Sequence, residues 1–251
     1  MENPKEPMTV DEFLKLSAEE RLALPFKERA TLNALLMAQN LNEQVNLRSP
    51  EVAASLLRKK PSSLTGSEPL HDAGEALGPT VVDFWRWSVS DLLSNATRGR
   101  LAEFLIAKAL GVGTLSPRDE WAAWDLTSPE PECIKIEVKC SAYLQSWYQA
   151  KLSSPSFSIK PSRAWDPDTA KLSPMSERQA QVYVFALLAH RDKTTVDPLN
   201  VRQWEFYVVP TSRIAGYQRS QSTITLRSLQ GLCEPASYQE LRAQVLLAVA
   251  Q

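Results

Sequence analysis

The chain has 251 residues, of which 43% are hydrophobic, so it is long enough to bury a core of its own. Its formal net charge of −1 excludes the strongly basic surface of a nonspecific nucleic-acid binder, so any contact with nucleic acid must be local or depend on metal ions. The N-terminal residues form no apolar signal region and no later stretch reaches the roughly 18 apolar residues of a membrane span, so we expect a cytoplasmic protein.

Helices are expected in the first 60 residues. A long helical pattern runs from about residue 27 to residue 47, and Ser49 with Pro50 predicts the start of another short helix. Two pairs at capping-box spacing mark earlier helix starts: Thr9 with Glu12, and Ser17 with Glu20. Residues 61–69 are rich in proline and serine and predict a linker.

The pattern changes to alternating helices and strands from about residue 81. A helix is expected from Val89 or Ser90 to Leu110, where Gly111 ends it, and a last helix from Ser237 to about Val249. The strand candidates are 121–126, 134–140, 156–160, 181–189, 204–210 and 222–227. Residues 181–189 are almost continuously apolar, as in a central strand covered on both faces. We therefore predict residues 1–70 as an N-terminal helical region with its linker, and residues 80–251 as an α/β domain with a mixed sheet between helices.

Strand 134–140 carries charges on one face. Because side chains alternate along a strand, Glu137 and Lys139 emerge on the same side, and such charges are costly in a covered sheet unless they pair or bind metal. A hairpin through residues 127–132 would bring Asp125 beside Glu137. Two carboxylates in one small volume favour a hard divalent cation.

Glu103 adds a third acid from the preceding helix. It lies on a stripe of small and apolar residues that we expect to face the sheet, formed by Ala96, Gly99, Ala107 and Leu110. The simpler alternative is an ion pair with Arg100, three residues earlier on the same helix.

An acid on a helix, an acid at a strand end and Glu137-Val138-Lys139 on the next strand resemble the PD-(D/E)xK nuclease superfamily. The resemblance covers about residues 90–209 and implies a restriction-endonuclease-like fold, a mixed β-sheet flanked by helices. Here Trp124 stands before Asp125, where many members have proline. Three stretches are also similar to segments of uncharacterised bacterial proteins: RGRLAEFLIAKALG, EVKCSAYLQSW and WEFYVVPTS.

The resemblance implies a nuclease that hydrolyses phosphodiester bonds, with DNA the expected substrate, using Mg²⁺ or Mn²⁺. Asp125, Glu137 and the Val138 carbonyl would hold the metal, and Glu103 would complete a second position. Lys139 would supply positive charge where negative charge builds in the transition state. Gln145 would orient a water or a phosphate oxygen, unless it is an ordinary surface-loop residue.

Substrate contacts are expected around the end of the same strand. The candidates are Arg100, Ser141, Tyr143, Trp147 and Lys151. Aromatic and basic residues in such a mixture suit base stacking and phosphate contacts. Aromatic residues at this density also pack in cores, so both interpretations remain open.

Two other functions remain open. A nuclease-like module without turnover would bind nucleic acid or a protein, with Glu137 and Lys139 as a simple ion pair. A toxin or defence component would need a partner before it acts. In the nuclease and in the binding module alike, the N-terminal helices are the expected surface for a homodimer or a protein partner, unless their apolar positions pack on the protein's own core.

Overall fold

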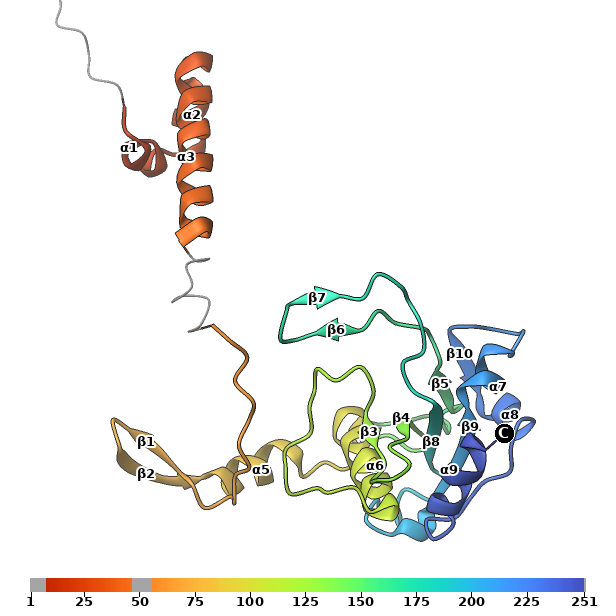
Figure 1. The fold of residues 1–251 in the computed structure, drawn as a ribbon. Coiled ribbons are helices and arrows are strands. Elements are labelled where there is room, and N and C mark those ends of the chain that lie inside the picture. The colour runs from red at the N-terminus through yellow and green to blue at the C-terminus, as the bar shows by residue number, and fades with distance from the viewer. Residues whose placement is uncertain (1–7, 47–55, 251) are drawn as a thin grey trace, which may run out of the picture. The chain divides into compact units, whose positions relative to one another are not determined.

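The computed structural model describes residues 8–46 and 56–250, and residues 38–46 through their backbone alone. The chain divides into two compact units, Met1–Lys59 and Lys60–Gln251 (Figure 1). In the described part of the chain, none of the helices combines the length and apolar character needed to cross a membrane. The predicted short helix at Ser49 and Pro50 lies outside the described residues.

Three helices lie in the described residues of the first unit. They are α1 (Val10–Lys15), α2 (Ala18–Ala23) and α3 (Phe26–Asn46). Both predicted capping boxes are confirmed, because the Thr9 and Ser17 side chains accept the backbone N–H groups of Glu12 and Glu20. A small separate core forms where Val10 and Phe13 of α1 pack with Leu32 of α3.

The second unit begins with a hairpin and a helix that the sequence did not predict. These elements are β1 (Pro69–Asp72), β2 (Glu75–Thr80) and α5 (Val81–Val89). Ala73 and Gly74 connect the strands with φ values of 47° and 99°. A tight type I′ hairpin turn requires positive φ at both of its central residues. Ala73-Gly74 predicts such a turn less strongly than Asn-Gly does, so the sequence did not reveal the hairpin.

A four-stranded mixed sheet, in the order β3-β4-β8-β9, forms the centre of this unit. Its strands are β3 (Leu126–Thr127), β4 (Lys135–Ala142), β8 (Val182–Leu188) and β9 (Trp204–Pro210). β4 runs parallel to β8, while the other two pairings are antiparallel. Every residue of β8 is buried, as predicted for a central strand. The expected mixed α/β architecture is confirmed.

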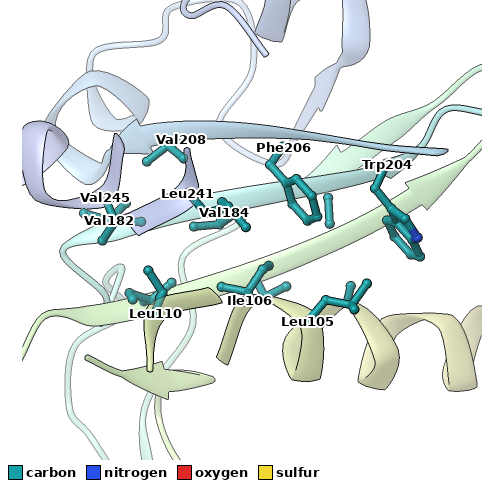
Figure 2. Packing of buried hydrophobic residues seen from close by; sticks show 14 of the residues in the cluster. Leu105, Ile106, Leu110, Val182, Val184, Trp204, Phe206, Val208, Leu241 and Val245 are labelled. Carbon is teal, nitrogen blue, oxygen red and sulfur yellow. The ribbon is translucent and has the colours of Figure 1, made fainter. Parts of the chain in front are cut away.

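One face of the sheet is covered by α6 (Asn95–Leu110) and α9 (Leu241–Val249). Figure 2 shows Leu105, Ile106 and Leu110 of α6 packed beneath the side chains of β8, β9 and α9. Ile106 is fully buried, and burying one such side chain contributes about 1.5–3 kcal/mol. This packing fixes α6, and with it Glu103, against the sheet.

The opposite face is covered by shorter elements. They are β5 (Ser156–Ser158), α7 (Thr211–Ala215), β10 (Thr223–Thr225) and α8 (Leu226–Gln230). A second core lies there, in which Phe185 and Tyr207 from the sheet are fully buried. Before β8 the chain also forms the small hairpin of β6 (Trp165–Asp166) and β7 (Lys171–Leu172), and between β8 and β9 the 3-10 turn η1 (Val201–Gln203).

Two predicted helix starts were wrong. The helix expected from Val89 or Ser90 is broken, because the Asp91 carboxylate accepts the N–H groups of Leu93 and Ser94 at 3.0 and 3.1 Å, and α6 begins only at Asn95. Such local bonds compete with a helix. The bonds expected between Ser237 and Glu240 do form, but helix α9 begins at Leu241.

The predicted strand at 121–126 was also mostly wrong. Only Leu126 and Thr127 pair with β4. Asp119 accepts the N–H of Trp121 at 3.0 Å through its carboxylate, which keeps the preceding residues in a turn. The other strands are confirmed, with β5 and β10 shorter than expected.

Candidate active site

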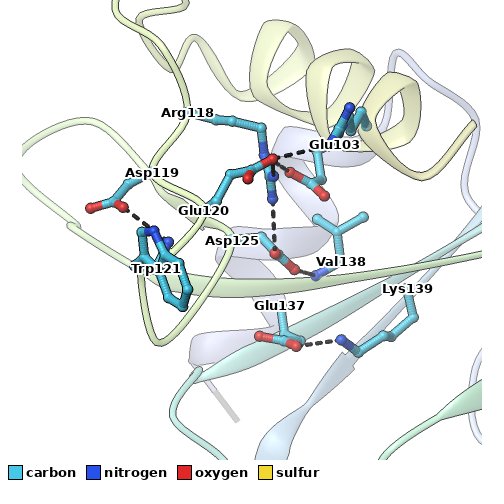
Figure 3. A network of polar contacts seen from close by, with 10 residues as sticks. Glu103, Arg118, Asp119, Glu120, Trp121, Asp125, Glu137, Val138 and Lys139 are labelled. Atoms are coloured by element: carbon cyan, nitrogen blue, oxygen red, sulfur yellow. Dashed lines mark hydrogen bonds and ion pairs between the residues drawn. The ribbon is translucent and has the colours of Figure 1, made fainter. Parts of the chain in front are cut away.

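The β3–β4 hairpin places Asp125 beside the charged strand, as expected. Leu126 lies opposite Ile136, and the Asp125 N–H continues the ladder by donating to the Ile136 carbonyl at 3.1 Å. The Asp125 carboxylate then accepts the Val138 N–H at 2.7 Å (Figure 3). The acid is therefore held at the edge of β4 by two hydrogen bonds.

The Val138 carbonyl is directed to the same edge. The carbonyls of Ile134 and Ile136 both accept N–H groups from the β3 side, whereas that of Lys135 accepts from Gln181 on the β8 side. Backbone groups alternate in direction along a strand, so the carbonyl of Val138 points the same way as that of Ile136. Beside it lies Asp125.

Glu137 and Lys139 leave β4 on the face away from α6. Their side chains form an ion pair (Figure 3) and are 20% and 30% exposed. Glu137 lies opposite Tyr183 of β8. Burial, together with the charge of Glu137, raises the pKa of Tyr183 to about 12.

Glu103 reaches the same region from α6. Its carboxylate does not pair with Arg100, as the simpler alternative expected, but accepts a bond from Arg118 Nε at 2.8 Å. Arg100 instead contacts Glu120 at 3.0 Å, and Arg118 contacts the same Glu120 oxygen at 3.2 Å. Arg118 also lies 4.0 Å from the Asp125 carboxylate, so one guanidinium faces three acids.

The three carboxylates influence one another. The pKa of Glu103 is raised, first by burial and then by the charge of Asp125, and Arg118 opposes the shift. The pKa of Glu137 is also raised by burial and by Asp125, with Lys139 acting in the opposite direction. Asp125 therefore lies within electrostatic reach of both glutamates, one on each side of it.

A divalent cation fits this donor set only as a largely hydrated ion. Among the described side chains, those of residues 8–37 and 56–250, no group of three or more histidine, cysteine, aspartate or glutamate residues is arranged to hold a metal. Mg²⁺ commonly uses one or two carboxylates and keeps several waters. Asp125 and Glu137 are two carboxylates that line one hollow, and a metal held by them stays a prediction.

Two hollows lie on either side of Asp125. One, of about 540 Å³, lies between α6 and the 112–127 segment and has Glu103, Arg118 and Asp125 in its wall. The other, of about 250 Å³, is lined by Asp125 and Glu137 together with residues 120–124 and 162–165. Asp125 lines both hollows.

Residues 86–228, which include this whole constellation, match the family model described as Bacteriophage T4 endonuclease IV. The chain belongs to the T4 endonuclease IV family. A search of curated proteins gave no match. All three acids and Lys139 lie inside the part of the chain that carries the family resemblance.

Gln145, the fifth predicted catalytic residue, is not an ordinary loop residue in this family member. It is 7% exposed, and its Nε2 donates to the Ala142 carbonyl and the Ser153 hydroxyl at 3.4 and 3.3 Å. Its Oε1 accepts from the buried Arg98 at 3.5 Å. These bonds shape the turn after β4, and a role for Gln145 in orienting water stays a prediction.

The predicted substrate residues fall into two places. Arg100 lies in the ion-pair network with Glu120. The others lie at the C-terminal end of β4 and in the loop after it, where the Arg191 guanidinium lies 4.3 Å from the Tyr143 ring and donates to its hydroxyl at 3.0 Å. There Trp147 is 53% exposed, and Ser141 and Lys151 are at least partly exposed. Their contact with substrate stays a prediction.

Sequence reasoning missed Arg118 and Glu120. Both lie in the segment SPRDEW, just before Asp125, where one basic residue is followed by two acidic ones. Such a run usually marks a solvated loop. The signal that could have identified Arg118 and Glu120 is the position of this segment between two predicted acids, Glu103 and Asp125.

Proposed function

We propose that this member of the T4 endonuclease IV family is a metal-dependent endonuclease that hydrolyses phosphodiester bonds of DNA, with a PD-(D/E)xK type of site. The observation that carries the proposal is the position of Asp125. It is held to the edge of β4 by the Val138 N–H and lies close enough to Glu103 and Glu137 to raise the pKa of both. The family match supports the reaction class.

Each residue has a defined task in this proposal. Asp125, Glu137 and the Val138 carbonyl would hold Mg²⁺ or Mn²⁺, and Glu103 would accept a metal-bound water or a second ion. The metal, when bound, supplies Lewis acidity at the phosphate and a more acidic water. Lys139 would release Glu137 and turn its ammonium to the attacking water or a non-bridging oxygen.

The test is cleavage of supercoiled, linear and single-stranded DNA, and of RNA, with Mg²⁺ or Mn²⁺. Glu137→Ala and Lys139→Ala should each lose metal-dependent cleavage while the chain stays folded. Glu75→Ala on the exposed β1–β2 hairpin and Lys108→Ala on the exposed side of α6 are matched controls and should cleave like the wild type. Absence of cleavage with every substrate and metal would refute the proposal.

One observation favours a module that binds without turnover. The ion pairs of Glu137 with Lys139 and of Glu103 with Arg118 already neutralise the acids without a metal. If this second function is correct, nucleic acid will bind equally well to wild type and to Glu137→Ala, and cleavage will be absent from both.

A further inference from the structure

The smaller hollow beside Asp125 has tryptophan walls that no step of the proposed chemistry uses. We name it the tryptophan hollow; Trp121, Trp124 and Trp165 line it, together with Arg163, Asp125 and Glu137. Three of the seven tryptophans of the chain therefore surround a space of about 250 Å³ next to the candidate catalytic acids.

The three rings come from two separate segments. Trp121 and Trp124 belong to the loop before β3, whereas Trp165 belongs to the β6–β7 hairpin, where it pairs with Leu172. Figure 3 shows Trp121 projecting from the loop that also carries Arg118 and Glu120. Two segments about 40 residues apart in sequence thus present aromatic surface to one space.

The rings differ in what already covers them. Trp124 is committed to the protein, because its Nε1 donates to the Thr127 hydroxyl at 2.9 Å and the Lys135 ammonium lies 4.2 Å from its ring centroid. Trp121 is 62% exposed and Trp165 is half-buried. A large apolar ring that stays exposed beside a polar site is a surface that a ligand can cover.

The residues that line the hollow favour a nucleobase over a protein segment as its ligand. An aliphatic protein segment would strip water from the partly exposed carboxylates of Asp125 and Glu137 without offering them a hydrogen bond, which is costly. A nucleobase offers a flat π face for Trp121 and Trp165, while its own phosphate can lie toward the guanidinium of Arg163. Arg163 is anchored by its Nε, which donates to the Ser173 carbonyl.

We propose that the tryptophan hollow is a nucleobase-binding site, in which Trp121 and Trp165 stack on a base adjacent to the scissile phosphate. This inference rests on the proposed nuclease function, since it places the phosphate at Asp125. It adds a contact with the bases themselves, made by residues that hold neither metal nor water. Stacking of this kind tolerates any base sequence, because every base has a π face.

The experiment measures binding without cleavage. The full chain in EDTA is titrated into a fluorescein-labelled DNA oligonucleotide of mixed sequence, and into a second oligonucleotide of equal length built from abasic sugar-phosphate units. Trp121→Ala and Trp165→Ala should each weaken binding to the first by on the order of 5- to 100-fold. Neither should change binding to the abasic strand.

Two variants keep the result specific. Trp121→Phe retains a π face and should bind within about threefold of the wild type. Trp87→Ala is the matched control, because Trp87 is 83% exposed on α5 and does not line the hollow. Thermal unfolding of each variant shows whether it is folded, and Trp121 can be replaced with little cost because its ring is mostly in solvent.

The proposal is overturned if Trp121→Ala and Trp165→Ala bind the normal strand like the wild type, if they weaken the abasic strand equally, or if the wild type binds neither strand. Failure of the nuclease proposal gives a different pattern. Metal-dependent cleavage would then be absent while binding in EDTA still depended on the bases and on Trp121.

Discussion

At the scale of single residues, Asp125 joins the backbone of the sheet to the charged site. One carboxylate oxygen accepts the Val138 N–H at 2.7 Å, and the other lies 4.0 Å from the Arg118 guanidinium. The same side chain therefore stabilises the edge of β4 and contributes negative charge, and substitutions can separate the two roles.

Asp125→Asn and Asp125→Ala should differ in stability but not in activity. Asparagine keeps an oxygen that accepts the Val138 N–H, whereas alanine leaves that donor unpaired at a cost of about 1–2 kcal/mol. Both remove the negative charge and should lower cleavage by on the order of 10²-fold or more. Urea unfolding and cleavage rates of the two variants test this, and equal stability of the two would contradict the structural role.

The two glutamates should make stability depend on pH. The pKa values of Glu103 and Glu137 are raised by burial above the ordinary 4.5, so the folded protein binds these protons more readily than the unfolded chain. The stabilisation from protonation is complete below the unfolded pKa and is lost as the pH rises through the folded pKa. We therefore expect the free energy of unfolding of the metal-free protein to fall as the pH rises from the unfolded pKa of the glutamates through their folded pKa.

Glu103→Gln and Glu137→Gln should each remove part of this fall, because glutamine stays neutral. Denaturant unfolding from about pH 4 to about pH 7 in EDTA measures the slope. Glu75→Gln on the exposed hairpin is the control and should keep the wild-type slope. A Glu137→Gln variant with the wild-type slope would show that burial of this carboxylate does not perturb its titration.

At the scale of elements, the segment between α6 and β3 is bound to the site through Arg118. Its guanidinium contacts Glu103 at 2.8 Å and lies near Asp125, so in the proposed nuclease it competes with a cation for the same acids. The pair is partly exposed, and such pairs contribute about 0–1 kcal/mol each.

Arg118→Gln should therefore strengthen Mn²⁺ binding by up to about fivefold. The concentration of free Mn²⁺, measured by electron paramagnetic resonance, reports this without any need for activity. Arg86→Gln removes another exposed ion pair, that with Asp83 of α5, and should leave Mn²⁺ binding unchanged. Weaker binding by Arg118→Gln would mean that Arg118 orders the acids for the metal instead of competing with it.

Elements with strong periodic patterns were predictable from sequence. The alternation of Ile134 to Cys140 and the apolar run 181–189 gave β4 and β8 correctly, because burial of one or both faces determines those patterns. The turn after Asp125 was predictable as well, from its prolines. The approach of Asp125 to Glu137 followed from these two results.

The breaks that local aspartate turns make in otherwise continuous patterns were not predictable. Asp91 and Asp119 each accept backbone N–H groups two or three residues later, and those bonds end a helix pattern and a strand pattern that continue in sequence. Arg118 could not be assigned to Glu103 either, since their contact joins residues 15 apart through a loop without periodicity. Trp165 could not be predicted to line the hollow, because it lies in a hairpin with only two residues in each strand.

At the scale of the whole molecule, the cores of the two units are separate. The cluster of Val10, Phe13 and Leu32 belongs to the helical unit, while α6, α9 and the sheet enclose the larger cores. All the candidate catalytic residues lie in the second unit. The described residues of the first unit contribute none of them.

A chain consisting of Lys60–Gln251 should fold alone and, if the nuclease proposal holds, retain metal-dependent cleavage. Its thermal midpoint should agree with the midpoint of the second unit measured in the full-length chain, because the truncation removes no residue of either large core. Calorimetry and the cleavage assay measure the two properties. An insoluble or inactive product would show that the helical unit supports the catalytic one.

The shortness of β3 has a consequence for solubility. Only Leu126 and Thr127 pair with β4, and in the described part of the chain no other strand continues along that side. A bare strand edge invites a strand from another molecule, which is the route to aggregation. Asp125, Glu137 and Lys139 place charges along this stretch, and an incoming β-strand would have to strip them of water. The charges that we assign to hydrolysis therefore also keep the open edge from joining another sheet.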